Sequence, residues 1–238
     1  MSQRGPHMQF AIRIPEIAQR DRFVKRAVAQ KHVFAVAGED GLARVTSPHN
    51  PQRELTLLWT SQTEAERWAD VLTTNPRVKQ IATAALIADV LPRLYSLERG
   101  VGMDWTADPV EAEIDPMELV QRLRQEGVET FLQRARLRRA VWMLEDANGP
   151  ALLVSHKADN QLVLPCWATR GEAEARIEGP WRDMLAVEIP LWNFVTMTLP
   201  WLVQQGWLVA PGHAEGAGTI EMAPPDLARR FEPEAVPA

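Results

Sequence analysis

The feature that most constrains this chain is a long internal repeat. When the sequence is shifted by 108 residues, positions 23–123 align with positions 131–231 without a gap, and 20 of the 101 pairs are identical. Unrelated sequences of ordinary composition would share about six. A period this long is far beyond that of solenoid repeats, so each copy is expected to be a domain of its own.

The order of predicted elements, which is the same in both copies, defines the fold class. Each copy begins with a helix and continues through short strands, hairpins and further helices. This mixture predicts an α+β protein of two tandem modules, each an antiparallel sheet with helices packed mainly on one face. The expected modules are 1–125 and 126–238, joined near 124–130, where Gly127 interrupts the pattern. Alternating apolar residues add an N-terminal strand over 8–14.

Turn and breaker residues recur at matching places in the two copies. Asp40-Gly41 and Asn148-Gly149 each follow an apolar strand, and both dipeptides are typical of type I′ hairpins, whose central residues need positive φ. In each copy a long apolar helix contains a proline, at position 92 or 200. A proline there removes an amide donor and predicts a kink or a break.

The stretches "WTSQTEAERW" from Trp59 and "WATRGEAEAR" from Trp167 repeat one strand-to-helix corner. In each, a hydroxyl residue three places before a glutamate predicts a capping box, formed by Ser61 with Glu64 and by Thr169 with Glu172. The tryptophans end the preceding strands. The repeated glutamates therefore have a structural role available and are interpreted as caps rather than catalytic acids.

With these motifs, each copy resembles the family called "domain of unknown function 2750". The resemblance rests on "WTSQTEAERWADVL", "VLPRLYSLERGVGMDWTADPVEAEIDPMEL" and "LPWLVQQGWLVAPG". The first half is also similar to the N-terminal part of the SseB-like proteins. The family brings no catalytic residue, and it implies small bacterial cytosolic interaction modules. The second copy has Gly212-His213 where the first has Asp104-Trp105.

Composition excludes several classes of protein. The net charge is −5 and acids and bases are interleaved, which disfavours nucleic-acid binding. No apolar run approaches the length of a membrane span, and the N-terminus lacks the apolar core of a secretory signal. A single cysteine, Cys166, cannot form an internal disulfide and fits a reducing compartment. The expected location is the cytoplasm, with no membrane partner.

No motif predicts a catalytic residue, a metal site or a cofactor. Cys166 matches Leu58 of the first copy on a strand expected to be buried, so it is interpreted as a substitute for an aliphatic residue. The alternative is a thiol activated by the helix that begins nearby. Ser47 and Ser155 recur as turn hydroxyls. The histidines are not clustered as zinc ligands are, and glycine-rich 212–218 does not precede a helix.

The binding candidates are acidic and aromatic side chains. An acidic loop in the first copy contains Asp104, Asp108, Glu111 and Glu113, which would suit a cation or a basic partner, or would form a solvated loop. Trp105 adjoins this loop.

Tryptophan provides the second group of candidates. Six of the nine tryptophans fall in the second copy, and Trp192, Trp201 and Trp207 lie in or beside a helix that is apolar all round. They are expected either to pack in the module's own core or to form a surface for the other module or a partner.

These observations favour a non-enzymatic cytosolic protein-binding protein. A specific form of this hypothesis is an immunity-type inhibitor that captures a basic bacterial toxin or effector. The alternative is a small-molecule-binding protein or enzyme, with a pocket between the modules lined by Trp105, Trp201 and the acidic loop. The expected partner is another protein, and self-association into a homo-oligomer is also possible.

Overall fold

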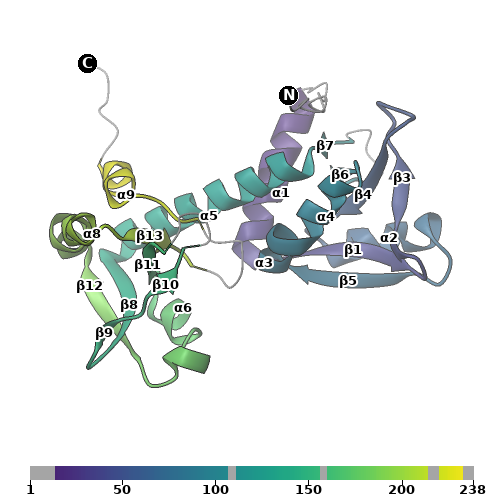
Figure 1. Cartoon of the computed structure of the whole chain (residues 1–238). Coiled ribbons are helices and arrows are strands. Elements are labelled where there is room, and N and C mark those ends of the chain that lie inside the picture. Colours follow the sequence, from purple (N-terminus) through teal and green to yellow (C-terminus); the bar gives the residue numbers. More distant parts are fainter. Residues whose placement is uncertain (1–13, 107–110, 156–159, 214–219, 233–238) are drawn as a thin grey trace, which may run out of the picture. The chain divides into compact units, whose positions relative to one another are not determined.

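The computed structural model describes residues 14–106, 111–155, 160–213 and 220–232. The chain forms two compact units, residues 1–126 and 127–238, called the first and second modules below (Figure 1). The expected strand over 8–14 lies outside the described residues except for Ile14, which is the first residue of a helix.

The first module contains the elements that follow. In chain order they are α1 (Ile14–Gln30), β1 (His32–Gly38), β2 (Gly41–Leu42), β3 (Arg44–Thr46), β4 (Glu54–Leu58), α2 (Gln62–Leu72), β5 (Arg77–Ala82), α3 (Thr83–Ala85), the π-helical turn η1 (Leu86–Val90), α4 (Leu91–Ser96), β6 (Gly100–Met103), β7 (Glu113–Ile114) and the start of α5 (Pro116–Arg138).

The second module repeats this order after the shift of 108 residues. Its elements after α5 are β8 (Ala140–Asp146), β9 (Gly149–Pro150), β10 (Leu153–Val154), β11 (Leu162–Cys166), α6 (Arg170–Glu174), the 3₁₀ turn η2 (Gly179–Trp181), β12 (Leu185–Pro190), α7 (Leu191–Asn193), the π-helical turn η3 (Phe194–Thr198), α8 (Leu199–Gln205), β13 (Leu208–Pro211) and α9 (Pro224–Phe231). The α+β class and the tandem repetition of one module are confirmed.

Each module builds its sheet in the same register. In the first module β1 pairs antiparallel with β2 and β5, and β4 pairs antiparallel with β3. A bridge between Phe34 and Trp59 joins the two groups, and Trp142 and Trp167 form the equivalent bridge in the second module. One pairing departs from the antiparallel sheet expected: β4 with β6, like β11 with β13, is parallel. Parallel strands need a long crossover, which α2, β5 and the following helices provide.

The central strand of each sheet is buried on both faces. In β1, Val33 and Ala35 join α1, α4 and α5 in one core, whereas Phe34 and Val36 face α2 in another. This explains why the strand is a continuous apolar run rather than an alternating one. In the first module most of the described helices cover one face, as expected, and α2 packs on the other.

The hairpins form where the sequence predicts them but with a different turn. Gly38 pairs with Gly41, and Asp146 pairs with Gly149, so the glycines close the turns rather than occupy their centres. Gly41 has φ of 107° and Gly149 has φ of 123°, and neither Asp40 nor Asn148 has a positive φ. Glycine at the closing position of a two-residue turn meets the need for positive φ there, so the type I′ assignment is wrong.

The proline-containing helices change their winding without ending. A π-helical turn, η1 or η3, precedes the proline in each module. In both turns an amide bonds five residues back, from Leu91 to Leu86 and from Leu199 to Phe194. The wider turn accommodates a residue that lacks an amide proton and would clash with the preceding turn of an α-helix.

The junction between the modules is helical. α5 runs unbroken through Gly127, which was expected to interrupt the pattern. Its first part matches α9 and its later part matches α1, so it fuses the last helix of one copy to the first helix of the next. Leu119 and Leu123 belong to the first core, and Phe131 and Leu132 belong to the second.

Candidate functional site

The single cysteine lies in the core of the second module. Cys166 is fully buried on β11, with its sulfur 3.8 Å from the carbonyl oxygen of Ala210. Burial raises the pKa of the thiol, so the reactive thiolate is disfavoured. Cys166 lies in an apolar cluster with Leu164 and Phe194, which agrees with its interpretation as a substitute for the aliphatic Leu58.

The repeated serines are turn hydroxyls that also hold a repeated glutamate. Ser47 Oγ accepts hydrogen bonds from the amides of His49 and Asn50 and donates one to Glu113 Oε1 at 2.7 Å. Ser155 donates in the same way to Glu221. Burial raises the pKa of Glu113, and the serine hydrogen bond opposes this shift. The hydrogen bond between Ser47 and Glu113 is interpreted as structural, because both side chains are buried.

Sequence reasoning missed a buried arginine beside Glu113. Arg20 on α1 is 1% exposed and donates through Nη2 to the backbone carbonyl of Glu113. Among the described residues, its Nε and Nη1, like Glu113 Oε2, find no hydrogen-bond partner. Burial lowers the pKa of Arg20. The only sequence signal is the comparison of copies, in which Val128 replaces Arg20.

The Asp104-Trp105 corner is part of the interior of the first module. Trp105 is buried, its carbonyl accepts from Trp59 Nε1 at 2.8 Å, and its own Nε1 donates to Ala112. Asp104 Oδ1 accepts from the amide of Thr60 at 2.6 Å, and Oδ2 accepts from the Thr60 hydroxyl at 2.8 Å. Both side chains therefore have structural partners within the first module, and their role in binding stays a prediction.

The second copy keeps the backbone of this corner with different side chains. The carbonyl of His213 accepts from Trp167 Nε1 at 2.9 Å, and Gly212 has the positive φ that Asp104 has in the first copy. Ala168 stands where the first copy has Thr60, so the aspartate and its hydroxyl partner are lost together. The corner needs a left-handed residue and a carbonyl, which glycine supplies without strain.

Asp104→Asn should alter how stability depends on pH. Burial is the main cause that raises the pKa of Asp104, against the lowering effect of the Thr60 hydrogen bonds. The protonated form of Asp104 stabilises the fold fully at pH values below its ordinary pKa of 3.8. This stability is lost as the pH rises through the raised pKa of the folded state. Asparagine tolerates positive φ, its Oδ1 can accept from the Thr60 amide, and its Nδ2 can donate to the Thr60 hydroxyl. The melting temperature of the wild type should rise relative to that of Asp104→Asn as the pH is lowered. A difference in melting temperature that does not change with pH would contradict this.

The acidic loop lies partly outside the described residues. Glu111 is half-buried, and Asp108 lies outside the described residues. Among the described residues, no group of three or more histidine, cysteine, aspartate or glutamate side chains is arranged to hold a metal ion. None of the described helices is long and apolar enough to cross a membrane.

The tryptophans of the second module separate into core and surface. Along α7, η3 and α8, Phe194, Leu199 and Leu202 point into the core. Trp192, Met197 and Trp201 point outward and are 75%, 65% and 39% exposed. Their spacings of five and four residues follow the π-helical turn and the α-helix after it, which keeps them on one side. We call these three residues the apolar stripe.

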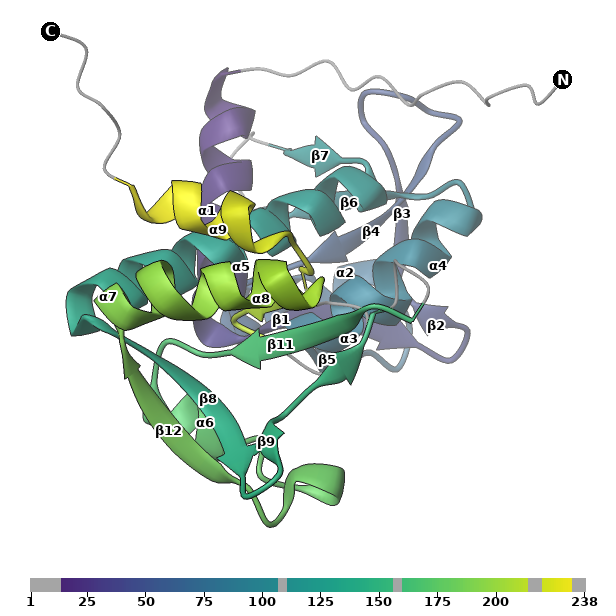
Figure 2. The ribbon, with the colours of Figure 1, turned by 60° about the vertical axis from the view of Figure 1, so that its left-hand side comes forward.

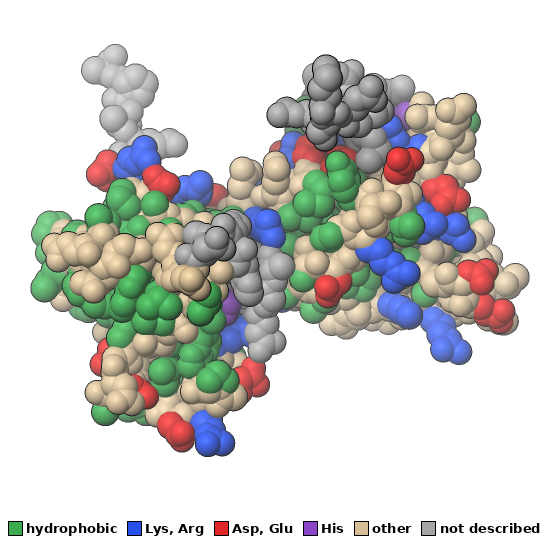
Figure 3. Space-filling model, in the orientation of Figure 1, with side chains coloured by type: hydrophobic (Ala, Val, Ile, Leu, Met, Phe, Trp, Pro, Cys, Tyr) green, Lys and Arg blue, Asp and Glu red, His purple; other side chains and the backbone are tan. Residues whose placement is uncertain are grey.

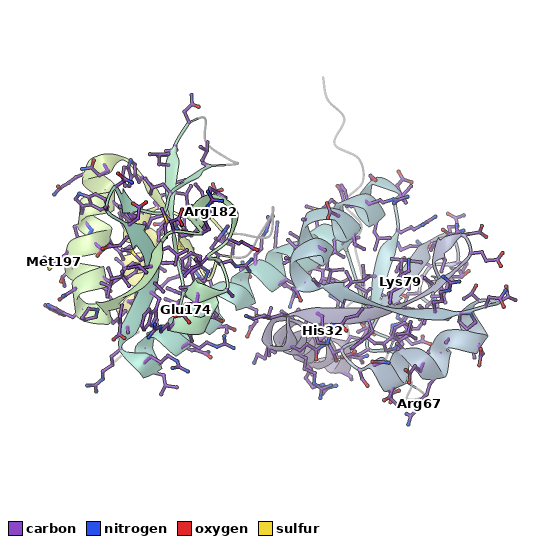
Figure 4. The ribbon with its side chains drawn as sticks, turned by 90° about the horizontal axis from the view of Figure 1, so that it is seen from below. His32, Arg67, Lys79, Glu174, Arg182 and Met197 are labelled. Carbon is purple, nitrogen blue, oxygen red and sulfur yellow. The ribbon has the colours of Figure 1, made fainter. Side chains whose placement is uncertain are left out.

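The apolar stripe lies in a segment of the chain without charged residues. Residues 191–206 contain no acidic or basic residue. Over α8, Figure 3 shows hydrophobic and uncharged side chains, and Figure 4 shows Met197 projecting away from the module. The half-buried Trp207 packs against Trp201, with ring centroids 5.1 Å apart in a T-shaped arrangement. Trp207 thus supports the stripe from the side.

The first module has no such stripe on the same scaffold. The equivalents of Trp192, Met197 and Trp201 are Ala84, Asp89 and Arg93. The backbone elements match residue by residue, so the fold does not require large apolar groups here. An exposed apolar cluster that the fold does not need is typical of an interaction site.

Comparison with known proteins gives a family and no activity. No curated protein matches the chain. Tic22 from Anabaena, described as a protein transport protein, is similar with a TM-score of 0.24 and 11% identity over 91% of this chain and 99% of its own. Tic22 from Plasmodium falciparum is similar with a TM-score of 0.24 and 9% identity over 79% and 91%. Likenesses this weak do not bear on function.

The family comparison agrees with the repeat. The family described as "Protein of unknown function (DUF2750)" matches residues 20–123 and again residues 128–231. The similarity of the first half to the SseB-like proteins stays a prediction. The two matches cover nearly all of both modules, and the chain therefore belongs to the DUF2750 family, of which it carries two copies in tandem.

Proposed function

We propose that this chain is a non-enzymatic protein-binding protein that docks its partner on the apolar stripe of the second module. The observation that carries the proposal is the contrast between the copies, because one scaffold presents Trp192, Met197 and Trp201 where the other presents Ala84, Asp89 and Arg93. Tryptophan is the residue most enriched among those that dominate binding energy at protein interfaces.

The partner that fits is a protein with an apolar cleft and a positively charged surround. The stripe supplies the apolar anchors, and the second module carries most of the chain's net negative charge. Opposite charge speeds encounter and selects among partners more than it adds affinity. A cytosolic inhibitor of a basic toxin or effector would use such a surface, and this is the specific form of the proposal.

The first module provides the residues for a matched test. The triple variant Trp192→Ala, Met197→Asp and Trp201→Arg carries the first module's side chains at equivalent places, so the fold should be retained. Wild type and variant are used as baits in a lysate of the native host, and proteins retained only by the wild type are identified. An identified partner is then purified and titrated calorimetrically.

Loss of the stripe should weaken binding by roughly 2 kcal/mol or more, about thirtyfold in Kd. Leu137→Ala serves as the control, because Leu137 is 85% exposed on α5 and lies outside the stripe. Equal affinity of wild type and triple variant for the purified partner would exclude the stripe as the docking site. Retention of no partner by the wild type would count against the function itself.

A further inference from the structure

The outer strand of the second module has an open edge. β12 pairs antiparallel with β8 on one side, and no described strand pairs with its other side. Figures 1 and 2 both show β12 at the margin of the sheet. An open edge presents unpaired amide and carbonyl groups, which are a template for another strand.

Hydrogen bonds inside the sheet identify the groups that point outward. Trp142 lies opposite Glu188 and exchanges both of its backbone hydrogen bonds with Trp167, on the other side of β8. Opposite residues of an antiparallel pair alternate between bonded and non-bonded. Glu188 and Ala186 therefore direct both N–H and C=O away from β8, whereas Pro190 directs only a carbonyl, because it has no N–H.

In the first module the same edge carries positive charge. β5 has the exposed Arg77 and Lys79 where β12 has Leu185 and Val187. Lysine on an edge strand is a common protection against pairing with another chain. Figure 4 labels Lys79 on β5. The second module lacks these positive charges on its edge strand, and Leu185 is 70% exposed.

We infer that β12 pairs antiparallel with β12 of a second copy of this chain, about a two-fold axis at Val187, so that the sheets of two second modules join. Ala186 of each copy then lies opposite Glu188 of the other, and each of these pairs exchanges both of its backbone hydrogen bonds. Val187 faces its own counterpart across the axis, and Leu185 faces Ile189.

Two features favour this register over an axis one residue closer to Pro190. An axis at Glu188 would place two carboxylates directly opposite each other, which is destabilising. It would also set Ala186 against Pro190, where a hydrogen bond is lost because proline has no donor. An axis at Val187 avoids both, and it brings together uncharged β-branched side chains. A two-fold axis needs one self-complementary surface, which this edge provides without another protein.

The inference rests on the backbone edge of β12 and goes beyond the proposed function, which rests on the apolar stripe. The first test is Val187→Lys, which copies Lys79 and places two ammonium groups on the axis. Sedimentation should show a wild-type dimer whose dissociation constant rises at least tenfold in Val187→Lys. The matched control, Trp192→Ala, copies Ala84 and should leave the dimer intact.

The second test fixes the register. Across the axis at Val187 the two Cα atoms would lie about 4.5 Å apart, as in a non-bonded antiparallel pair, which is within the range that a disulfide spans. Val187→Cys should therefore form an intermolecular disulfide on mild oxidation, and Glu188→Cys should not. Cys166 is buried and gives little background.

Several outcomes would overturn the inference. These are a wild type that stays monomeric at every concentration, a dimer that Val187→Lys leaves unchanged, and cross-linking through Glu188→Cys in place of Val187→Cys. A dimer lost in Trp192→Ala but kept in Val187→Lys would move self-association to the stripe. The proposed function is tested separately, because it is measured as the affinity for a partner protein in the stripe variants and not as dimer formation.

Discussion

Replacing Trp59 with alanine is expected to lower the free energy of unfolding of the first module by about 3–5 kcal/mol. Trp59 is fully buried, and its indole packs 6.3 Å from the ring of Trp68. Its Nε1 donates to the carbonyl of Trp105, and its backbone bridges to Phe34. Alanine would leave a cavity where the two strand groups meet and an unsatisfied carbonyl at the Trp105 corner.

The measurement is urea unfolding of the full chain combined with amide hydrogen exchange of β1 and β4, which reports on the first module alone. The control is Trp192→Ala, the same chemical change at a side chain that is 75% exposed. Its effect should stay within about 0.5 kcal/mol. Comparable losses in both variants would mean that Trp59 does not hold the strand-to-helix corner.

Replacing Phe131 with alanine is expected to destabilise the second module by about 3–5 kcal/mol. Phe131 lies on the later part of α5, is 2% exposed, and meets the ring of Phe231 at 6.2 Å between centroids. It joins Phe194 and Leu202 in the core beneath the apolar stripe. Its loss would remove the ring contact between α5 and α9, which also meet through Arg136 and Glu129.

Exchange of the β8 and β11 amides measures this effect, because both strands belong to the second module. Leu137→Ala is the control on the same helix, since Leu137 is 85% exposed. The Phe131→Ala variant should speed exchange in β8 and β11 and the control should not. Unchanged exchange in Phe131→Ala would show that the core relaxes into the space left by the ring.

Much of the fold is readable from the sequence, because the repeat checks each local signal twice. The strands 32–38 and 140–146 are apolar runs bounded by turn residues, and both form over those ranges. The caps also form, with Ser61 accepting from the amide of Glu64 and Thr169 from that of Glu172. The side chain of Glu64 accepts a hydrogen bond from Arg67, and that of Glu172 accepts one from Arg134.

Other features depend on tertiary structure that no local pattern encodes. The parallel pairing of β4 with β6 follows from where the chain returns after its crossover helices. The continuity of α5 through Gly127 follows from packing on both sides of the glycine, which offsets its weak helix propensity. Turn type at Gly41 is fixed by the strand register, and the dipeptide alone does not reveal it.

The candidate site could be predicted only in part. Trp192, Trp201 and Phe194 are equally apolar, and an α-helical period of 3.6 residues does not describe the π-helical turn between them. The sequence therefore could not separate core from surface. The alignment of the two copies did contain a signal, because Met197 and Trp201 of the second copy align with the charged Asp89 and Arg93 of the first.

The fused helix α5 completes the core of the first module and begins the core of the second in one continuous segment. The first core includes Leu119 and Leu123, and the same helix then supplies Val128 and Phe131 to the second. On the ribosome, the first module cannot close until the chain has emerged past residue 123, when the opening turns of its neighbour's helix are already being made. A protease cut between the modules would therefore fray both, because each would be left with a truncated helix end.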